Sequence, residues 1–239
     1  MKRILILLFP LLVAGTPALK GQAALLVLIF GDKAATENFH FSMKLGMNYS
    51  IIHGYDEGKN GMGVNFGVVN NIRLNDRFTL LAEFLPLSAR SIRDVPVVTT
   101  GNPELDSLLV DVKSTDRRLS YIDVPILVKA KLSERFSISA GPQISFLTGA
   151  TDTYKSAPIK GAELTSEIDI KSSIRSVDVA AVIDLMYILV PPKSGKGINL
   201  FFRYSKGFID IGTNEGFGRQ TASLFQVGAT FPFVEKVQE

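Results

Sequence analysis

The chain has 239 residues, contains no Cys and no Trp, and carries a formal net charge of +3. The absence of Cys excludes a disulfide scaffold, a Cys nucleophile and a lipid anchor on an N-terminal Cys. The apolar run near the start is interrupted by Pro and Gly, and no later stretch reaches the roughly 18 uninterrupted apolar residues that a membrane-spanning helix needs. We therefore expect one large β domain rather than a helical membrane protein.

The chain begins with the pattern of an export signal. Two basic residues precede an apolar run, and small residues follow it, so we expect a signal peptide over residues 1–23. This segment holds Lys2, Arg3 and Lys20 and no acidic residue. Removing these three positive charges leaves the exported chain neutral, so its composition predicts no binding to nucleic acid.

Residues 24–38 follow as an N-terminal periplasmic segment, apolar to Phe30 and polar afterwards. The pattern fits a short helix or strand, and it equally fits an extension of the apolar region of the signal.

From Phe39 onwards, apolar and polar residues alternate with a period of two, which is typical of strands with two different faces. The clearest case is the hairpin over residues 119–149, where Ile138 and Ile144 lie on one face and Ser139 and Ser145 on the other. Eight such segments are predicted as strands: 39–49, 62–74, 78–89, 119–132, 136–149, 177–188, 198–208 and 223–233.

The connections between these segments alternate in length. Short turns at 75–76, 133–135 and 191–197 alternate with longer loops at 50–61, 90–118, 150–176 and 209–222. Membrane barrels have short periplasmic turns and longer extracellular loops. We therefore predict an all-β fold, an eight-stranded antiparallel up-and-down transmembrane β-barrel over residues 39–233, with a C-terminal tail over 234–239. A soluble lipocalin-like barrel is the alternative, but it would need the apolar face to point inward and the charges outward.

Charged residues occupy the face opposite the apolar one and are predicted to form a polar network in the lumen. Eight strands leave an interior that side chains can fill, and opposite charges there can pair. We therefore expect a filled lumen rather than a wide diffusion pore. Some of the carboxylates could instead work as an acid/base pair, although a paired barrel core is the commoner outcome. The predicted network consists of Lys44, Arg73, Glu83, Asp123, Lys129, Asp178, Asp184 and Arg203.

The sequence predicts no catalytic residue, no cofactor and no metal site. The two histidines are His40, expected in the lumen at the rim of the first strand, and His53, expected in an outer loop. No second histidine lies at ligand spacing from either of them. The Lys- and Gly-rich turn at 193–197 lacks the spacing of a phosphate-binding loop. The alternative, a barrel enzyme acting on lipid or peptide, would use His53 as its base.

Three short motifs resemble the PorT-like outer-membrane β-barrel family of Bacteroidetes. They are the segment 121–129, which includes a mid-strand Pro125, the pair Gly141-Pro142, and the segment 203–207. A proline in the middle of a strand is unusual, but it is characteristic of this family. The resemblance implies a small outer-membrane barrel, and some relatives assist the type IX protein secretion system. The sequence differs from the usual barrel ending, because six residues follow Phe233.

These observations predict a non-enzymatic protein of the bacterial outer membrane with a structural or accessory envelope role. An accessory subunit of a type IX secretion system is the alternative drawn from the resemblance. The expected partners are outer-membrane lipid and proteins of the envelope or of a secretion complex, while the oligomeric state stays open.

Overall fold

The computed structural model describes residues 38–55, 57–95, 112–156, 165–193, 196–212 and 219–233. The predicted signal peptide, all but the last residue of the segment 24–38, and the tail 234–239 lie outside these ranges. Within them, no helix is both long and apolar enough to cross a bilayer.

The sheet is a closed antiparallel barrel of eight strands. Each strand pairs with its neighbour along the chain, and β1 also pairs with β9, with Met43 opposite Phe231 and Met47 opposite Val227. This last pairing closes the sheet and removes its free edges. The barrel strands are β1 (Phe39–His53), β2 (Lys59–Arg73), β3 (Phe78–Val95), β4 (Val112–Lys131), β5 (Phe136–Ser156), β7 (Val177–Lys193), β8 (Lys196–Gly207) and β9 (Thr221–Phe233).

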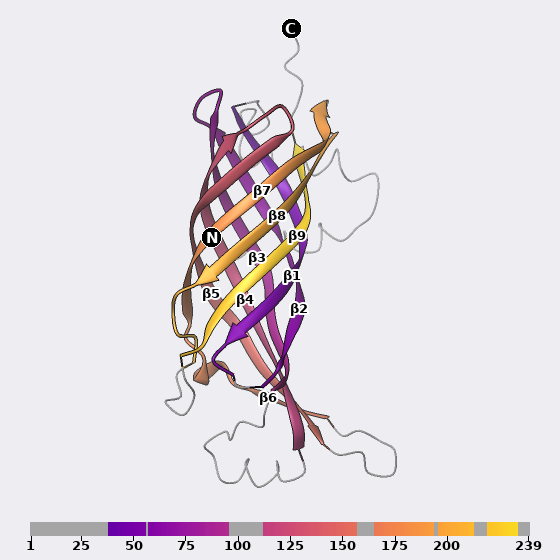
Figure 1. Cartoon of the computed structure of the whole chain (residues 1–239), viewed down its shortest axis with the longest axis vertical. Coiled ribbons are helices and arrows are strands. Elements are labelled where there is room, and N and C mark those ends of the chain that lie inside the picture. The colour runs from indigo at the N-terminus through magenta and orange to yellow at the C-terminus, as the bar shows by residue number, and fades with distance from the viewer. Residues whose placement is uncertain are drawn as a thin grey trace, which may run out of the picture.

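The predicted number of strands and the predicted barrel are confirmed, but several strands are longer than the sequence indicated. β3, β4 and β5 have 18, 20 and 21 residues, whereas about 9 to 11 residues cross a bilayer. Their extra residues project beyond the other strands at the long-loop end, the lower end in Figure 1. Residues 90–95 and 112–118 of the predicted 90–118 loop are therefore strand, while residues 96–111 lie outside the described ranges. The predicted 191–197 turn narrows to the residues between β7 and β8.

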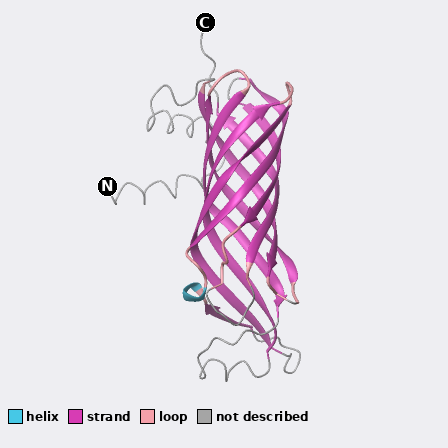
Figure 2. Cartoon of the chain, turned by 60° about the vertical axis from the view of Figure 1, so that its left-hand side comes forward, coloured by secondary structure: helices cyan, strands magenta, loops and turns pink. Residues whose placement is uncertain are grey.

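A short additional strand, β6 (Thr165–Asp169), pairs with the projecting part of β5. The 3-10 turn η3 (Lys171–Ser173) follows it and is the cyan element near the lower end of Figure 2. The sequence pattern did not predict either element.

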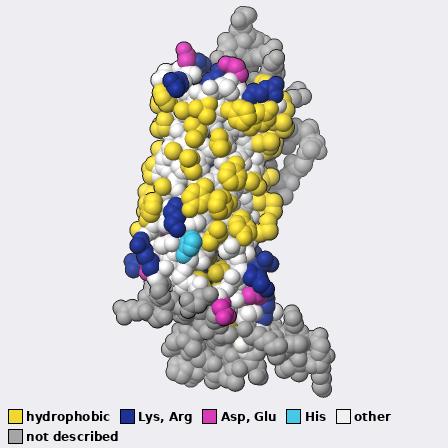
Figure 3. Space-filling view, viewed as in Figure 1, with side chains coloured by type: hydrophobic (Ala, Val, Ile, Leu, Met, Phe, Trp, Pro, Cys, Tyr) yellow, Lys and Arg dark blue, Asp and Glu magenta, His cyan; other side chains and the backbone are white. Residues whose placement is uncertain are grey.

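The outer wall of the barrel carries a broad apolar belt. In Figure 3 apolar side chains cover the middle of the molecule, and most charged side chains gather toward its two ends. The belt contains many large side chains that are 37–60% exposed, such as Leu45, Met47, Phe202 and Val227. Large exposed apolar area is costly in water, so this wall is suited to lipid.

The alternation of faces changes beyond the belt at the long-loop end. There, apolar side chains turn inward and form a buried cluster across β1, β3, β4 and β5, closed by residues that follow β6 and β8. On β3, Ile92 points inward while Arg93 is exposed. Beyond the belt the barrel is therefore built like a soluble protein. This apolar end cluster consists of Ile52, Ile92, Val95, Leu119, Tyr121, Leu147, Ala150, Ile170, Ile174 and Ile211.

Two glycines face each other where β1 and β9 close the barrel. Gly46 is paired with Gly228, and a Cβ on either residue would lie 2.8 Å from the ring of Phe201 on β8. Because neither glycine has a side chain, the Phe201 ring can lie over the junction of β1 and β9. An aromatic ring packed over a glycine offsets the destabilising effect of glycine in a strand.

Candidate functional site

Two buried ion clusters in the lumen are the main candidate for a functional site. A small apolar cluster of Val69, Leu81, Leu127 and Val182 is buried on the same inner face of the strands. The first ion cluster, which we name the four-charge cluster, joins Lys44 on β1, Glu83 on β3, Asp184 on β7 and Arg203 on β8. The strand alternation points all four side chains inward from different parts of the wall. Their side chains are at most 1% exposed, and their formal charges cancel.

Arg203 is the centre of the four-charge cluster. Its Nη1 and Nη2 donate to Glu83 Oε2 and Oε1 at 2.8 and 2.7 Å, the fork geometry typical of strong arginine–carboxylate pairs. Its Nε donates to Asp184 Oδ2 at 2.9 Å. Lys44 Nζ lies 3.3 Å from both Glu83 oxygens and 4.1 Å from the centre of the Phe201 ring. One arginine thus links two carboxylates that lie far apart in the chain.

The second cluster, which we name the three-charge cluster, is built around Arg90. Its Nη1 donates to Asp178 Oδ2 at 2.6 Å, and its Nη2 contacts Asp123 Oδ1 at 3.1 Å. Ser145 Oγ accepts from Nη2 at 2.8 Å, and Ser88 Oγ donates to Asp123 at 2.6 Å. The guanidinium also lies 4.0 Å from the centre of the Tyr121 ring, a distance at which a cation and an aromatic face attract each other.

A third buried pair lies at the long-loop end. Arg117 Nε and Nη2 donate to the two oxygens of Asp152 at 2.8 and 2.7 Å, and its Nη1 donates to the Tyr55 hydroxyl at 2.5 Å. Tyr55 follows β1 and donates in turn to Gln220 Oε1 at 3.3 Å. Burial raises the pKa of the Tyr55 phenol above its ordinary value, so it stays a neutral hydroxyl near neutral pH.

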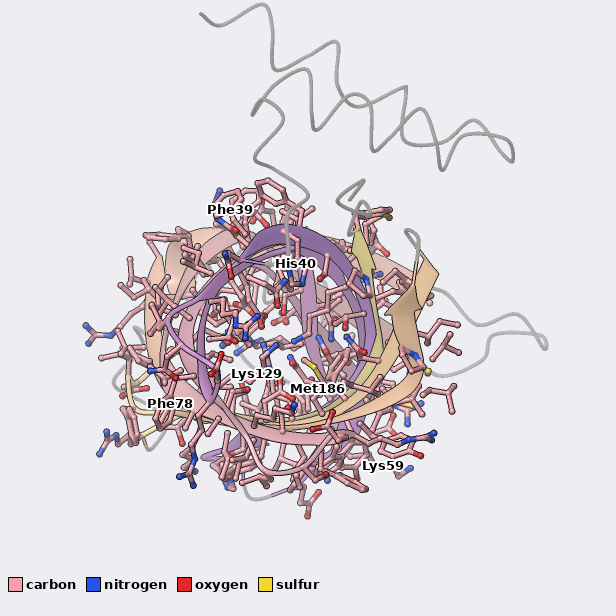
Figure 4. The ribbon with its side chains drawn as sticks, turned by 90° about the horizontal axis from the view of Figure 1, so that it is seen from above. Phe39, His40, Lys59, Phe78, Lys129 and Met186 are labelled. Atoms are coloured by element: carbon pink, nitrogen blue, oxygen red, sulfur yellow. The ribbon has the colours of Figure 1, made fainter. Side chains whose placement is uncertain are left out.

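The short-turn end holds a basic basin of about 480 Å³. Lys129 reaches it from inside the barrel, and Figure 4 shows its side chain and that of Met186 pointing into the lumen. Lys129 forms no ion pair within the described part of the chain, although Asp184 attracts it electrostatically. The other charged residues that line the basin are Arg73, Asp76, Arg77, Lys131, Glu134 and Arg135.

A comparison with family models identifies residues 30–212 as an outer membrane protein beta-barrel domain. The match covers well over half of the chain and includes both lumen ion clusters. The chain belongs to this outer-membrane β-barrel family. It is therefore a protein of the bacterial outer membrane. Barrels of this kind have their short turns at the periplasmic end and their long loops at the extracellular end, and we name the two ends of this barrel accordingly.

Solved structures of other outer-membrane barrels have the same general architecture at low sequence identity. Ail, the attachment invasion locus protein of Yersinia pestis, is 14% identical with a TM-score of 0.40, and the match covers 83% of this chain and all of Ail. Neisserial surface protein A is 11% identical with a TM-score of 0.44, over 82% of this chain and all of that protein. OprG from Pseudomonas aeruginosa is 11% identical with a TM-score of 0.38, over 84% of this chain and 99% of OprG. A comparison with curated proteins gives no match.

Six of the eight residues predicted for the lumen network lie in the two ion clusters: Lys44, Glu83, Asp123, Asp178, Asp184 and Arg203. Lys129 also lies inside the barrel wall, but at the periplasmic basin. Arg73 differs from the prediction, because its side chain is 39% exposed and pairs with Asp76 in the turn after β2. Arg73 is on the inward face by the alternation of β2, but it is the last residue of that strand. Its side chain therefore meets solvent at the rim of the barrel.

Sequence reasoning missed Arg90 and Arg117, which it placed in the 90–118 loop. Both are buried, and both hold carboxylates. The pairing of β3 with β4 is irregular between Leu85 and Ser88. This irregularity reverses the alternation, so Glu83 points inward before it and Arg90 after it, and the sequence alternation gave no signal for Arg90.

The two histidines lie apart from the ion clusters. His40 is at the periplasmic end of β1, and Figure 4 places it at the inner side of the wall. His53 is not in a loop as predicted, because it is the last residue of β1. Its Nε2 lies 3.2 Å from Ser223 Oγ on β9, and no carboxylate pairs with it among the residues that the structure describes. Over the same ranges, no group of three metal-binding side chains is found.

Proposed function

We propose that the protein is a non-enzymatic structural or accessory component of the outer membrane whose lumen conducts no solute. The observation that carries this proposal is the burial of the ion clusters. Their carboxylates and guanidinium groups are at most 1% exposed, whereas side chains lining a water-filled pore would be accessible. A barrel filled in this way acts through its extracellular surface, its outer wall and its periplasmic rim.

Electrical recording from planar bilayers tests the closed lumen. We expect no reproducible conductance steps from the wild-type barrel. The double variant Glu83→Ser/Arg203→Ser removes one charge of each sign and the bulk of the four-charge cluster, and it should conduct small ions. The matched variant Arg73→Ser/Asp76→Ser removes an exposed pair at the rim and should stay silent. Stable ion-conducting steps from the wild type would disprove the proposal.

The PorT-like resemblance leads to a second candidate, an accessory subunit of a type IX secretion complex. The basic basin at the periplasmic mouth supports it. Five basic residues line the basin against two acidic ones, and each of the acidic side chains already pairs with one of the basic ones. The surplus positive charge suits an acidic segment of a periplasmic partner protein.

The native mass of the protein after detergent extraction separates the two candidates. A mass of one chain with its micelle supports the free-standing barrel. A larger particle supports the accessory subunit, and it should dissociate in the variant Arg77→Glu, which reverses a charge in the basin. Arg118→Glu, at the extracellular end, is the matched control and should leave the particle intact.

A further inference from the structure

Three side chains form a small polar patch on the outer wall near the extracellular end of the belt. Lys206 Nζ on β8 donates to Ser223 Oγ on β9 at 3.1 Å. The same hydroxyl lies 3.2 Å from His53 Nε2 on β1. We name these three residues, His53, Lys206 and Ser223, the outer-wall patch. Strand register brings them together, because β9 lies between β1 and β8 and Ser223 pairs with Lys206.

The outer-wall patch lies one step beyond the apolar belt on each of its strands. On β8 the outward series Leu200, Phe202 and Tyr204 ends at Lys206, and on β9 Phe225 borders the patch from the membrane side. The rings of Tyr204 and Phe225 are 4.9 Å apart and form this border. The depression that contains the patch has a volume of about 370 Å³ and is lined by Ile51, His53, Tyr204, Lys206, Ser223 and Phe225.

The charge of the patch is not balanced by the protein. Lys206 is partly buried, and its hydrogen-bond partner Ser223 is neutral. Within the ranges that the structure describes, Lys206 takes part in no ion pair. A cation held against an apolar wall at a membrane boundary is costly unless an anion meets it. In a bilayer the anions at this depth are the phosphate groups of lipids.

We propose that the outer-wall patch binds the phosphate group of an anionic lipid in the extracellular leaflet. The Lys206 ammonium pairs with the phosphate, and the exposed His53 ring lies beside it. The buried Ser223 hydroxyl contacts both side chains and holds them in place. The acyl chains lie along the apolar surface of Ile51, Tyr204 and Phe225. A lipid thus makes both ionic and apolar contacts with this surface, whereas a free phosphate ion can make only the ionic contacts.

Native mass spectrometry of the intact barrel tests this proposal. The protein is delipidated and transferred to micelles with equal amounts of phosphatidylglycerol and phosphatidylcholine of identical acyl chains. We expect the wild type to retain phosphatidylglycerol preferentially. Lys206→Gln should reduce this preference about fivefold, the effect of one lysine near a membrane surface. Lys171→Gln is the matched control, since it removes an exposed lysine of the same end that donates to a backbone carbonyl.

Three results of the retention measurement would overturn the proposal. The first is equal retention of the two lipids by the wild type, and the second is an equal loss of preference in Lys171→Gln. The third is displacement of phosphatidylglycerol by inorganic phosphate at the same concentration, which would identify a free-anion site. The heat-dependent shift in gel mobility shows whether each variant is folded. If Lys206→Gln does not fold, Lys206→Arg keeps the charge and must retain the preference.

The same samples separate binding from chemistry at the Ser–His contact. Retained lipid of unchanged mass is the result expected for a binding site. Loss of one acyl chain in the wild type but not in Ser223→Ala would show a hydrolytic site and would overturn the proposal.

Discussion

Arg203 illustrates how a single buried side chain holds the lumen together. It forms charge-assisted hydrogen bonds to Glu83 and Asp184. Removing one member of a buried ion pair leaves the others without compensation, and this costs more than the pair itself contributes.

We expect Arg203→Met to lower the free energy of unfolding by about 3 to 5 kcal/mol, because two carboxylates then share Lys44 alone. The measurement is the urea concentration at which half of the protein in detergent micelles is unfolded. Folded and unfolded chains are distinguished by their different mobility in gels. Arg73→Met is the matched control. Its pair with Asp76 is exposed, so the loss should stay within about 1 kcal/mol. Equal losses in both variants would contradict the stabilising role of the buried cluster.

The orientation of residues in the membrane zone could be predicted from the sequence, and that of residues beyond the belt could not. Between the two bilayer surfaces charged residues face the lumen, so the alternation correctly placed Lys44, Glu83 and Asp184. Some apolar residues, such as Leu81 and Leu127, point inward as well. Beyond the belt both faces of β3 carry charge, Arg90 inside and Arg93 outside. The irregular pairing between Leu85 and Ser88 also reverses which residues of β3 point inward. The alternation of apolar and polar residues is therefore interrupted there, and the strand end was predicted too early.

The partners within each ion cluster were also beyond reach of the sequence. Glu83 and Arg203 are 120 positions apart. Their contact depends on the register of all the strands and on the closure of the barrel. The alternation along a strand identifies the face on which a residue lies. It does not identify the position of the residue along the barrel axis or the residue that it contacts across the lumen.

At the scale of elements, the closing seam between β1 and β9 is a tightly fitted part of the sheet. A Cβ at Gly228 would lie 2.1 Å from the Leu45 carbonyl oxygen and 2.5 Å from the Gly46 Cα. Backbone atoms of a paired strand cannot move aside as a flexible side chain can.

We therefore expect Gly228→Ala to destabilise the barrel by about 1 to 3 kcal/mol, the usual cost of overpacking. Gly149→Ala is the control, because the nearest atom to its Cβ would be Ser120 Cβ at 4.0 Å, and it should leave stability nearly unchanged. The stability of both variants is measured as the temperature at which the band of the folded protein disappears from gels. A loss in Gly149→Ala as large as that in Gly228→Ala would show that the close backbone contacts at Gly228 are not the cause of the destabilisation.

At the scale of the whole molecule, the lengths of the connections orient the barrel in the membrane. The absence of Cys from the chain allows a direct test with single cysteines. We expect a membrane-impermeant maleimide to label Ser172→Cys on intact cells, because η3 lies at the extracellular end. Glu134→Cys, in the turn between β4 and β5, should react only after the outer membrane is opened. The reverse pattern would show that the long loops face the periplasm.

The four-charge cluster also bears on how the barrel is made. Asp184 and Arg203 face each other on the paired strands β7 and β8 and can meet in a sheet that is still open. The contacts of Glu83 with Arg203 and of Lys44 with Asp184 join β1 and β3 to β7 and β8, so they form only when the first and last strands join. The paired hydrogen bonds between Arg203 and Glu83 therefore form in the final step of folding, and an unfinished barrel does not yet contain them. The ion pairs that form on closure stabilise the closed barrel against reopening. Insertion is therefore reversible until the barrel is complete and hard to reverse afterwards.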